Sequence, residues 1–374
     1  MQLKIDADEN ASDLDEMDGE EDFVFPPAER KVITQPVDLS ISSVLEQWDL
    51  QQLTLPPIQR EYVWDNGKAS RLAESLILNI PVPVLYFAET KEAKYEIIDG
   101  HQRVRSVVRF LKNEFSLSGL AVLREYKGMR FHQLPEREQR FLRMRTLRAI
   151  IISVDSHPNM KFEIFERLNT GAISLNAQEL RNSIYRGSLN ELLHQLVKDP
   201  VLRRLLGTKT PRRRMVDEEL LLRFFALRSS LGTYRTPLKR FLNGFMLSMK
   251  DAPEDDLNQL AHVFTRSVQC VEDVFGPAAF RNLDPAGNPS ESTVNRALFD
   301  AQLLAASWIS THPTAVQAKA ARLAIAKLFS DEGFLDSIQR ATGDRARTLR
   351  RLRETVAAME SAGIEFLVPF DLSK

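Results

Sequence analysis

The chain has 374 residues, of which 43% are hydrophobic and 27% are charged, and its net charge is −1. This composition is ordinary for globular domains, and no apolar run approaches the roughly 18 residues of a membrane span, so we predict no membrane-spanning segment. A single cysteine, Cys270, excludes an intrachain disulfide framework and a cysteine metal cluster, and the acidic start lacks a secretory pattern, so we expect a cytoplasmic protein.

The small net charge hides an asymmetry. Residues 1–25 hold ten acidic side chains and one lysine, a local charge of −9, and the remaining chain therefore carries +8. We predict an acidic, disordered tail over residues 1–36, in which two consecutive prolines, Pro26 and Pro27, favour an extended arm. Such a tail either serves as a solvated leader or competes with an anionic ligand for the basic surface of the body.

From residue 37 the pattern predicts a mixed α+β region. We expect a short capped helix over 38–48 and an extended segment over 50–64, because the adjacent prolines Pro56 and Pro57 oppose a helix. An amphipathic helix follows over 66–80 and is closed by Pro81. Two strands, over 83–90 and 94–100, are separated by three residues and are expected to pair.

The second half of this region continues with further helices and a strand. We predict a helix from His101 to Lys112, a buried strand over 146–155, a helix from Pro158 to Gly171, and a capped helix over 176–187. After residue 188 strand signals stop, and apolar residues recur at helical spacing. The expected architecture is a ParB/sulfiredoxin-like α+β domain over 37–188, with a small mixed sheet, followed by an all-α domain over 189–374.

The stretch IIDGHQR forms a sharp corner between the second strand and the helix at His101. Gly100 permits a tight turn, and the first N–H groups of the new helix favour an anion. Arg103 and Arg105 suit phosphate, and Gln102 supplies directional hydrogen bonds. For Asp99 we expect one of three roles: it pairs with an arginine, it accepts helix N–H groups, or it binds a metal ion. The alternative for the whole stretch is an ordinary helix start that Asp99 caps.

Two further stretches accompany the corner. In PIQREYVW a proline-stiffened backbone presents an amide, a guanidinium and two aromatic rings, which suits a nucleobase with its phosphate. The alternative is a core-edge segment in which Trp64 only packs. In FERLNTG polar residues lie at a helix end, and the alternative is an ordinary glycine-terminated helix.

Taken together and in this order, the three stretches resemble the N-terminal domain of GmrSD-type modification-dependent restriction proteins, which is shared with nucleotide-hydrolysing sensors of anti-phage defence. The family pattern is Pro-x-x-Gln-Arg-x-x-x-Trp, then Asp-Gly-Gln-Gln-Arg, then Phe-x-Arg-x-Asn-x-Gly. The resemblance covers about residues 38–190 and extends more loosely to about 245. It implies a domain that binds and hydrolyses an NTP, with Mg²⁺ as a further cofactor, and that acts on or senses phage or modified DNA.

The resemblance also implies site residues, to which the chemistry of neighbouring side chains adds others. The expected nucleotide-binding residues are Gln59, Arg60, Trp64, Gly100, Arg105 and Asn169. The expected catalytic residues are Asp99, His101, Gln102 and Arg103, with Asp99 also the metal ligand. His101 replaces the first glutamine of the family motif; because histidine titrates near neutral pH, survival of hydrolysis is left open.

Other features bear on the partners. The six histidines are dispersed, so we predict no His-Asn-His nuclease in this chain, and no Walker-type phosphate loop occurs. Clustered basic residues are expected to contact the DNA backbone, unless they belong to salt-bridged helix faces. These residues are Arg203, Arg204, Lys209, Arg212, Arg213 and Arg214. Similar basic stretches occur over 137–148 and 341–355.

The leading hypothesis is an NTP-binding and NTP-hydrolysing sensor or regulator of a restriction-type defence system. It would bind DNA, act with a separate nuclease or other effector protein, and either stay monomeric or form a homo-oligomer. One alternative is a non-catalytic ParB-like DNA-binding protein with a vestigial site. The other is a protein-interaction module of a defence complex.

Overall fold

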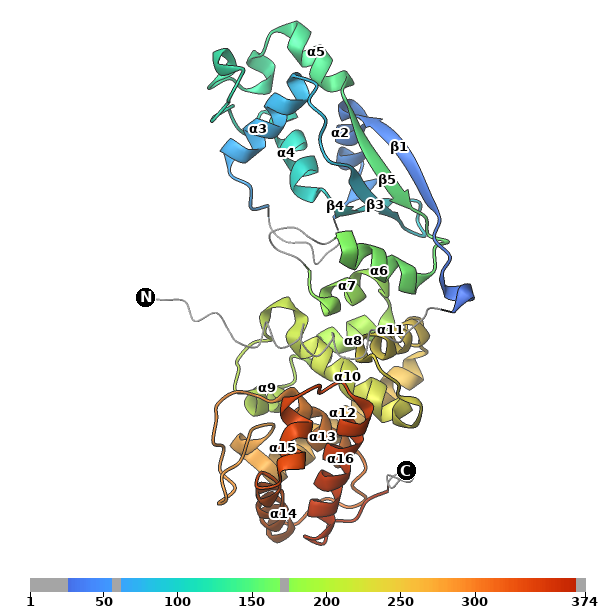
Figure 1. Ribbon diagram of the computed structural model, residues 1–374, viewed down its shortest axis with the longest axis vertical. Coiled ribbons are helices and arrows are strands. Elements are labelled where there is room, and N and C mark those ends of the chain that lie inside the picture. The colour runs from blue at the N-terminus through green and yellow to red at the C-terminus, as the bar shows by residue number, and fades with distance from the viewer. Residues whose placement is uncertain (1–25, 56–61, 169–174, 368–374) are drawn as a thin grey trace. The chain divides into compact units, whose positions relative to one another are not determined.

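The computed structural model describes residues 26–55, 62–168 and 175–367, and the chain forms two compact units, Phe25–Leu175 and the part from Asn176 onward (Figure 1). The first unit combines a sheet with helices. Its elements are β1 (Thr34–Ser40), α2 (Ile41–Asp49), β2 (Leu53–Thr54), α3 (Asn66–Ile77), β3 (Leu85–Glu89), β4 (Tyr95–Asp99), α4 (His101–Leu111), α5 (Glu136–Met144), β5 (Thr146–Ile152) and α6 (Pro158–Leu168).

The sheet has five strands in the order β1-β5-β3-β4-β2 and is mixed. β3 and β4 pair antiparallel, which confirms the pairing expected from the three-residue separation, whereas β3 and β5 run parallel. β1 is antiparallel to β5, and β2 is parallel to β4. The two strands that frame the Asp99–Gly100 corner, β3 and β4, thus lie side by side within the sheet.

One prediction about the start of this unit was wrong. The helix expected over 38–48 begins only at Ile41, where Ser40 accepts a hydrogen bond from the backbone N–H of Ser43 at 3.0 Å. The preceding residues, Thr34–Ser40, form the edge strand β1 instead. An edge strand tolerates Pro36, because a residue that lacks an N–H can face away from the ladder. Pairing with the distant strand β5 makes this segment a strand, and the local sequence does not predict such a pairing.

The core of the first unit lies between the sheet and the helices α2 to α5. Leu85 and Phe87 alternate inward from β3, and Ile97 does so from β4; each is fully buried. From α4, Val104, Val107, Val108 and Leu111 enter the same core, which is the helical spacing read from the sequence. The corner is therefore built on two elements that are both anchored in one core.

A buried carboxylate fastens the long connection after α4 to α3. Glu74 accepts backbone hydrogen bonds from Ala121 at 3.0 Å, Val122 at 2.7 Å and Leu123 at 2.8 Å. Burial by itself would raise the pKa of Glu74, but these donors hold the pKa below its ordinary value because they stabilise the charged form. Nearby, Ser70 accepts a hydrogen bond from the N–H of Ser118 at 2.9 Å.

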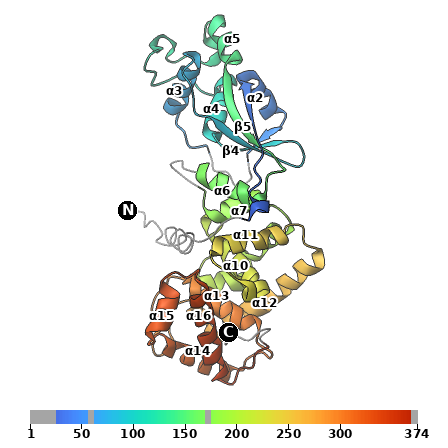
Figure 2. The same ribbon diagram turned by 45° about the vertical axis from the view of Figure 1, so that its right-hand side comes forward.

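The second unit is helical throughout its described part, apart from short turns and isolated bridges. Its α-helices are α7 (Ala177–Ile184), α8 (Ser188–Leu196), α9 (Pro200–Leu206), α10 (Val216–Ser230), α11 (Leu238–Ser248), α12 (Glu254–Phe275), α13 (Arg296–Ser307), α14 (Ala315–Leu328), α15 (Glu332–Gln339) and α16 (Arg345–Glu360). Figure 2 shows α14 and α15 beside α16, which both contact. The capping box expected at Asn176 and Glu179 is confirmed.

Charged residues lie inside this helical unit. Arg223 of α10 and Asp300 of α13 are paired at 2.6 Å, and Arg351 of α16 approaches the same carboxylate at 3.4 Å. All three side chains are almost completely buried. Removing one partner of such a pair leaves an uncompensated buried charge, so the pairing fixes the mutual arrangement of α10, α13 and α16.

These features confirm the predicted α+β architecture followed by a helical region. The likeness to a ParB or sulfiredoxin fold and the domain limits at residues 36 and 188 remain predictions. No helix in the described ranges combines the length and apolar character needed to cross a membrane.

We predict that Glu74→Gln lowers the free energy of unfolding by about 2 kcal/mol, because a neutral amide replaces a carboxylate that accepts three backbone N–H groups. Since the pKa of Glu74 is depressed in the fold, its contribution is present above the ordinary carboxyl range and is lost as pH falls through the folded-state pKa. Denaturant unfolding between pH 3 and 7 tests this. The exposed Glu125→Gln serves as the control, and an equal loss for both variants would contradict the prediction.

Candidate functional site

The corner between β4 and α4 depends on a glycine with no room for a side chain. Gly100 has φ +96°, in the left-handed region, and directly precedes α4. A Cβ at this position would lie 2.3 Å from Leu85 Cδ2, far inside van der Waals contact. The backbone of the turn therefore packs directly on β3, and the start of α4 is held at the end of the strand pair.

Arg103 closes the corner. Its guanidinium donates to Asp99 Oδ2 at 2.7 Å and to the backbone carbonyls of Pro83 and Val84, which precede β3. The Arg103 side chain is only 12% exposed, whereas that of Asp99 is 43% exposed. Burial lowers the pKa of Arg103, and the carboxylate of Asp99 partly offsets this. Arg103 thus acts as a clasp between three chain segments and holds Asp99 in a fixed orientation at the surface.

Gln102 joins the corner to the proline-rich stretch upstream. Its Oε1 accepts the backbone N–H groups of Val63 at 3.1 Å and Trp64 at 3.2 Å. This double acceptance fixes the orientation of the amide, so its Nε2 faces His101 Nε2 at 2.7 Å. Because the amide nitrogen can only donate, the imidazole Nε2 must accept, which requires a neutral ring protonated at Nδ1.

Tyr62 makes a second link to α4. Its hydroxyl lies 2.9 Å from Ser106 Oγ, and Ser106 in turn donates to the carbonyl of Gln102 at 2.7 Å. The guanidinium carbons of Arg105 and Arg109 lie 5.3 and 4.5 Å from the centre of the Tyr62 ring, within cation–π distance. The sequence did not identify Ser106 as part of this linkage; its only signal was a small polar residue among the apolar positions of α4.

The predicted residues separate into three groups. Asp99, Gly100, His101, Gln102, Arg103 and Arg105 lie at the corner, and Trp64 lies beside it. Trp64 is partly buried against the core, as its packing alternative expected, and base stacking by it stays a prediction. Gln59, Arg60 and Asn169 lie outside the described residues, so their relation to Arg103 stays a prediction as well.

The corner offers one carboxylate to a metal ion. Across the described parts of the chain, no three His, Cys, Asp or Glu side chains gather in a cluster that could hold one. Mg²⁺ bound to a nucleotide takes most of its ligands from phosphates and water and needs only one or two protein carboxylates, so Asp99 alone fits such a role.

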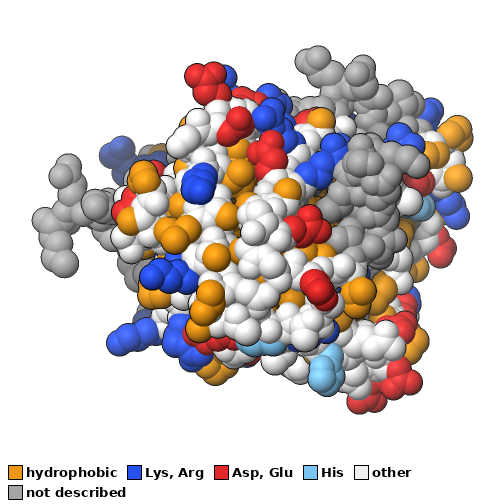
Figure 3. Space-filling model, turned by 90° about the horizontal axis from the view of Figure 1, so that it is seen from below, with side chains coloured by type: hydrophobic (Ala, Val, Ile, Leu, Met, Phe, Trp, Pro, Cys, Tyr) orange, Lys and Arg blue, Asp and Glu red, His pale blue; other side chains and the backbone are white. Residues whose placement is uncertain are grey.

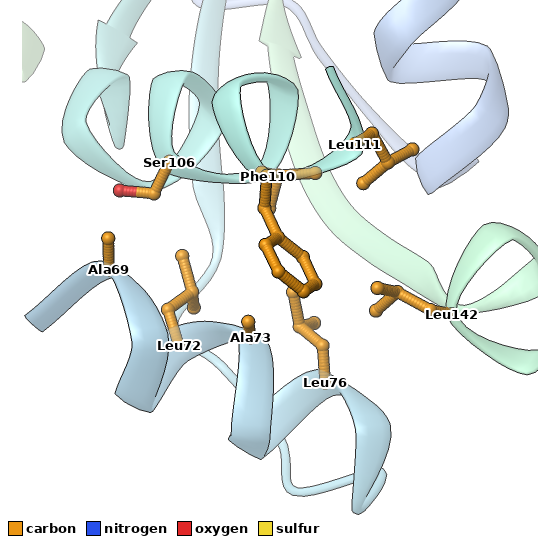
Figure 4. A pocket seen from close by; sticks show the side chains of 9 residues that line it. Ala69, Leu72, Ala73, Leu76, Ser106, Phe110, Leu111 and Leu142 are labelled. Atoms are coloured by element: carbon orange, nitrogen blue, oxygen red, sulfur yellow. The ribbon is translucent and has the colours of Figure 1, made fainter. Parts of the chain in front are cut away.

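An apolar cavity lies next to the site and is separate from it. It is lined by α3 and α4 side chains that include Leu72, Leu76 and Phe110, and Leu142 of α5 closes one side (Figure 4). It has room for about one water-sized sphere and is almost wholly apolar. This cavity cannot accept a nucleotide.

The six residues predicted to contact DNA fall into two groups, those in ion pairs and those that are exposed. Four arginines are ion-paired in the helical unit: Arg203 and Arg212 with Asp217, both at 2.6 Å, Arg204 with Glu272 at 2.7 Å, and Arg214 with Glu179 at 3.4 Å. Lys209 and Arg213 are exposed. On the face shown in Figure 3, basic side chains are interspersed with acidic ones. DNA binding by this segment stays a prediction.

Comparison with known families agrees with the motif order. Residues 41–186 match the model of the N-terminal domain of GmrSD restriction endonucleases, in agreement with the resemblance seen in the sequence. The match includes the corner and the linked segment after the prolines, and it extends into α7. No curated protein matches the chain.

We predict that Gly100→Ala destabilises the protein far more than Gly128→Ala. Both glycines have positive φ, but a Cβ at Gly128 meets nothing within 4 Å. The control should therefore cost about 1 kcal/mol, the left-handed penalty alone, and Gly100→Ala about 3 kcal/mol, because Leu85 must also move. Urea unfolding measures the difference, and similar losses would show that the turn is not tightly packed.

We predict that His101 carries its proton on Nδ1 near neutral pH. Imidazole ¹⁵N chemical shifts distinguish this tautomer from the Nε2–H form. Replacing Gln102 by methionine removes this donor and should lower the fraction of the ring that is protonated at Nδ1, while His132 serves as an internal control. An Nε2–H tautomer in the parent protein would contradict the hydrogen-bond assignment.

Proposed function

We propose that this protein, whose residues 41–186 match a GmrSD-type N-terminal domain, is a sensor or regulator of a restriction-type defence system that binds and hydrolyses an NTP at the β4–α4 corner. One observation carries the proposal: Gln102 hydrogen-bonds the backbone N–H groups of Val63 and Trp64, the last two residues of the proline-rich motif. The end of this motif therefore meets a residue 38 positions further along the chain, as a composite ligand site requires.

Phosphate binding would use the beginning of α4. The N-cap residue Gly100 brings no side chain of its own to the start of α4, and the first N–H groups of a helix carry partial positive charge. Arg105, one turn into the same helix, lies over the ring of Tyr62 and would add a cation beside these N–H groups. Arg60, two residues before Tyr62 in the sequence, is proposed to supply a further cation.

Hydrolysis would depend on Asp99. Its carboxylate is partly exposed and fixed by Arg103, so it is placed to orient a water molecule or to hold a nucleotide-bound Mg²⁺, which would neutralise phosphate charge. Arg103 is nearly buried and bonded to Asp99 and to two carbonyls, so we propose that it positions Asp99 and does not itself touch the phosphates.

DNA binding is proposed for the segment between α9 and α10, where Lys209 and Arg213 are exposed. The paired arginines of this segment would hold its shape: Arg203 and Arg212 both contact Asp217 of α10. A separate effector would carry out cleavage, since this sequence lacks the clustered histidines of a His-Asn-His nuclease.

A second candidate function is non-catalytic DNA binding. The pairing of Asp99 with Arg103 and the substitution of the family glutamine by His101 favour it, because an oxygen of Asp99 that already accepts from Arg103 is less available to a water molecule. In that case nucleotide would bind without turnover, or would not bind at all.

We predict that Asp99→Asn lowers NTP hydrolysis about 100-fold or more, the usual share of a general base, while binding of a fluorescent NTP analogue changes less than about threefold. The assay uses each of the four NTPs with Mg²⁺, with and without DNA. Asp38→Asn is the control, because it also removes a carboxylate paired with an arginine, Arg148, in the same unit.

An Asp99→Asn variant that hydrolyses NTP at the parent rate would exclude the catalytic role of Asp99. A parent protein that turns over none of the four nucleotides but binds DNA, with an affinity indifferent to NTP, would favour the second candidate. Thermal melting of both variants identifies any loss that arises from unfolding.

A further inference from the structure

Helix α5 is firmly attached to the first unit along one side. Leu142 is 1% exposed and packs in the core. Just past the helix, Arg145 donates to the carbonyl of Leu76 at 3.2 Å and to that of Ile77 at 3.4 Å, at the end of α3. The orientation of α5 is therefore fixed, and so is the choice of side chains that it turns outward.

The exposed side of α5 combines arginines that have no carboxylate partner among the described residues with exposed apolar side chains. Phe141 is 41% and Met144 is 73% exposed. Arg137, Arg140 and Arg143 are exposed, and none has a carboxylate partner among the described residues. We call these five residues the arginine face of α5.

This surface differs from the basic segment that runs from α9 to the start of α10. In that segment four of the six basic residues are paired with carboxylates, as described above. On the arginine face the guanidinium carbon of Arg137 instead lies 5.2 Å from the ring of Phe141, and that of Arg143 lies 5.0 Å from the ring of Phe131. Exposed arginine, phenylalanine and methionine are the residue types enriched at binding surfaces.

We propose that the acidic tail of this same chain, residues 1–25, binds the arginine face of α5. The tail carries a charge of −9 and includes Leu14, Met17 and Phe23 among its acidic residues, so it matches the face in charge and also offers apolar side chains. The cations of α5 would pair with tail carboxylates, and the exposed Phe141 and Met144 would be covered by the apolar residues of the tail.

The dimensions of the unit permit this contact. The tail joins the described chain at Pro26, and β1 begins eight residues later, at Thr34. β1 runs antiparallel to the seven-residue strand β5, which directly follows α5, so Pro26 lies at most about 50 Å from α5 along the chain path. Twenty-five extended residues reach about 85 Å.

The tail would act as an internal competitor. A segment attached to the same chain is present at an effective concentration in the millimolar range, so even weak binding covers the face most of the time. An anionic ligand of the face, such as nucleic acid, would have to displace it, and salt would weaken the contact. This inference does not depend on nucleotide binding at the β4–α4 corner.

The test measures access to position 144 in the full chain. Met144→Cys introduces a reactive thiol, whereas the native Cys270 is buried and its pKa is raised to about 12, so it reacts slowly with a maleimide. Labelling rates are compared between the parent tail and a tail whose ten acidic residues are replaced by Asn or Gln. We expect the parent tail to slow labelling at least fivefold at low salt, and 1 M NaCl to remove the difference.

Two matched variants locate the contact. Replacing Arg137, Arg140 and Arg143 by glutamine removes no ion pair with a described residue and should abolish the protection by the tail. Leu50→Cys, at a 60% exposed position of the same unit, should label equally with either tail. Equal labelling of Met144→Cys with both tails would overturn the proposal. Protection of position 144 that remains after the three arginines are replaced by glutamine would also overturn the proposal. The same holds if protection appears only when a DNA oligonucleotide is added and is equal with both tails.

Discussion

The candidate site depends on one interaction, the clasp that Arg103 makes with Asp99 and with the carbonyls before β3. A nearly buried guanidinium needs acceptors, and Arg103 finds them at Asp99, four residues earlier in the chain, and at the adjacent residues Pro83 and Val84. Gly100 makes the clasp sterically feasible, because a side chain at that position would collide with Leu85. The corner is therefore rigid before any ligand arrives, which reduces the entropy that binding must overcome.

The basic residues of the chain are unequal in what they can do. In the helical unit, arginines such as Arg203 and Arg223 are paired with buried carboxylates, so their charge is neutralised within the fold. On α5, arginines remain without carboxylate partners in the described part of the chain and border exposed apolar groups. The chain outside the tail has a net charge of +8, but the surface that can bind an anionic ligand is smaller than a count of its arginines suggests.

Much of the first unit could be predicted because its signals are local. The β3–β4 pair, the tight turn at Gly100 and the start of α4 at His101 follow from turn chemistry and periodicity, and so does the capping box at Asn176 that opens the second unit. β1 could not be predicted in this way, because Thr34–Ser40 becomes a strand only by pairing with β5, more than 100 residues away. The same holds for Ser106, whose role appears only when Tyr62 is next to it.

The sequence by itself determined which chemical groups stand at the corner, in which order the family motifs occur, and that helices follow the α+β region. It determined them because residue type, turn preference and hydrophobic period are properties of neighbouring positions. The tertiary structure alone decided which groups from distant segments face one another: that Arg103 reaches the carbonyls of Pro83 and Val84, that Gln102 holds the segment after the prolines, and which arginines of the helical unit are paired. Such pairings depend on distances between segments remote in sequence, and only the packed core sets those distances.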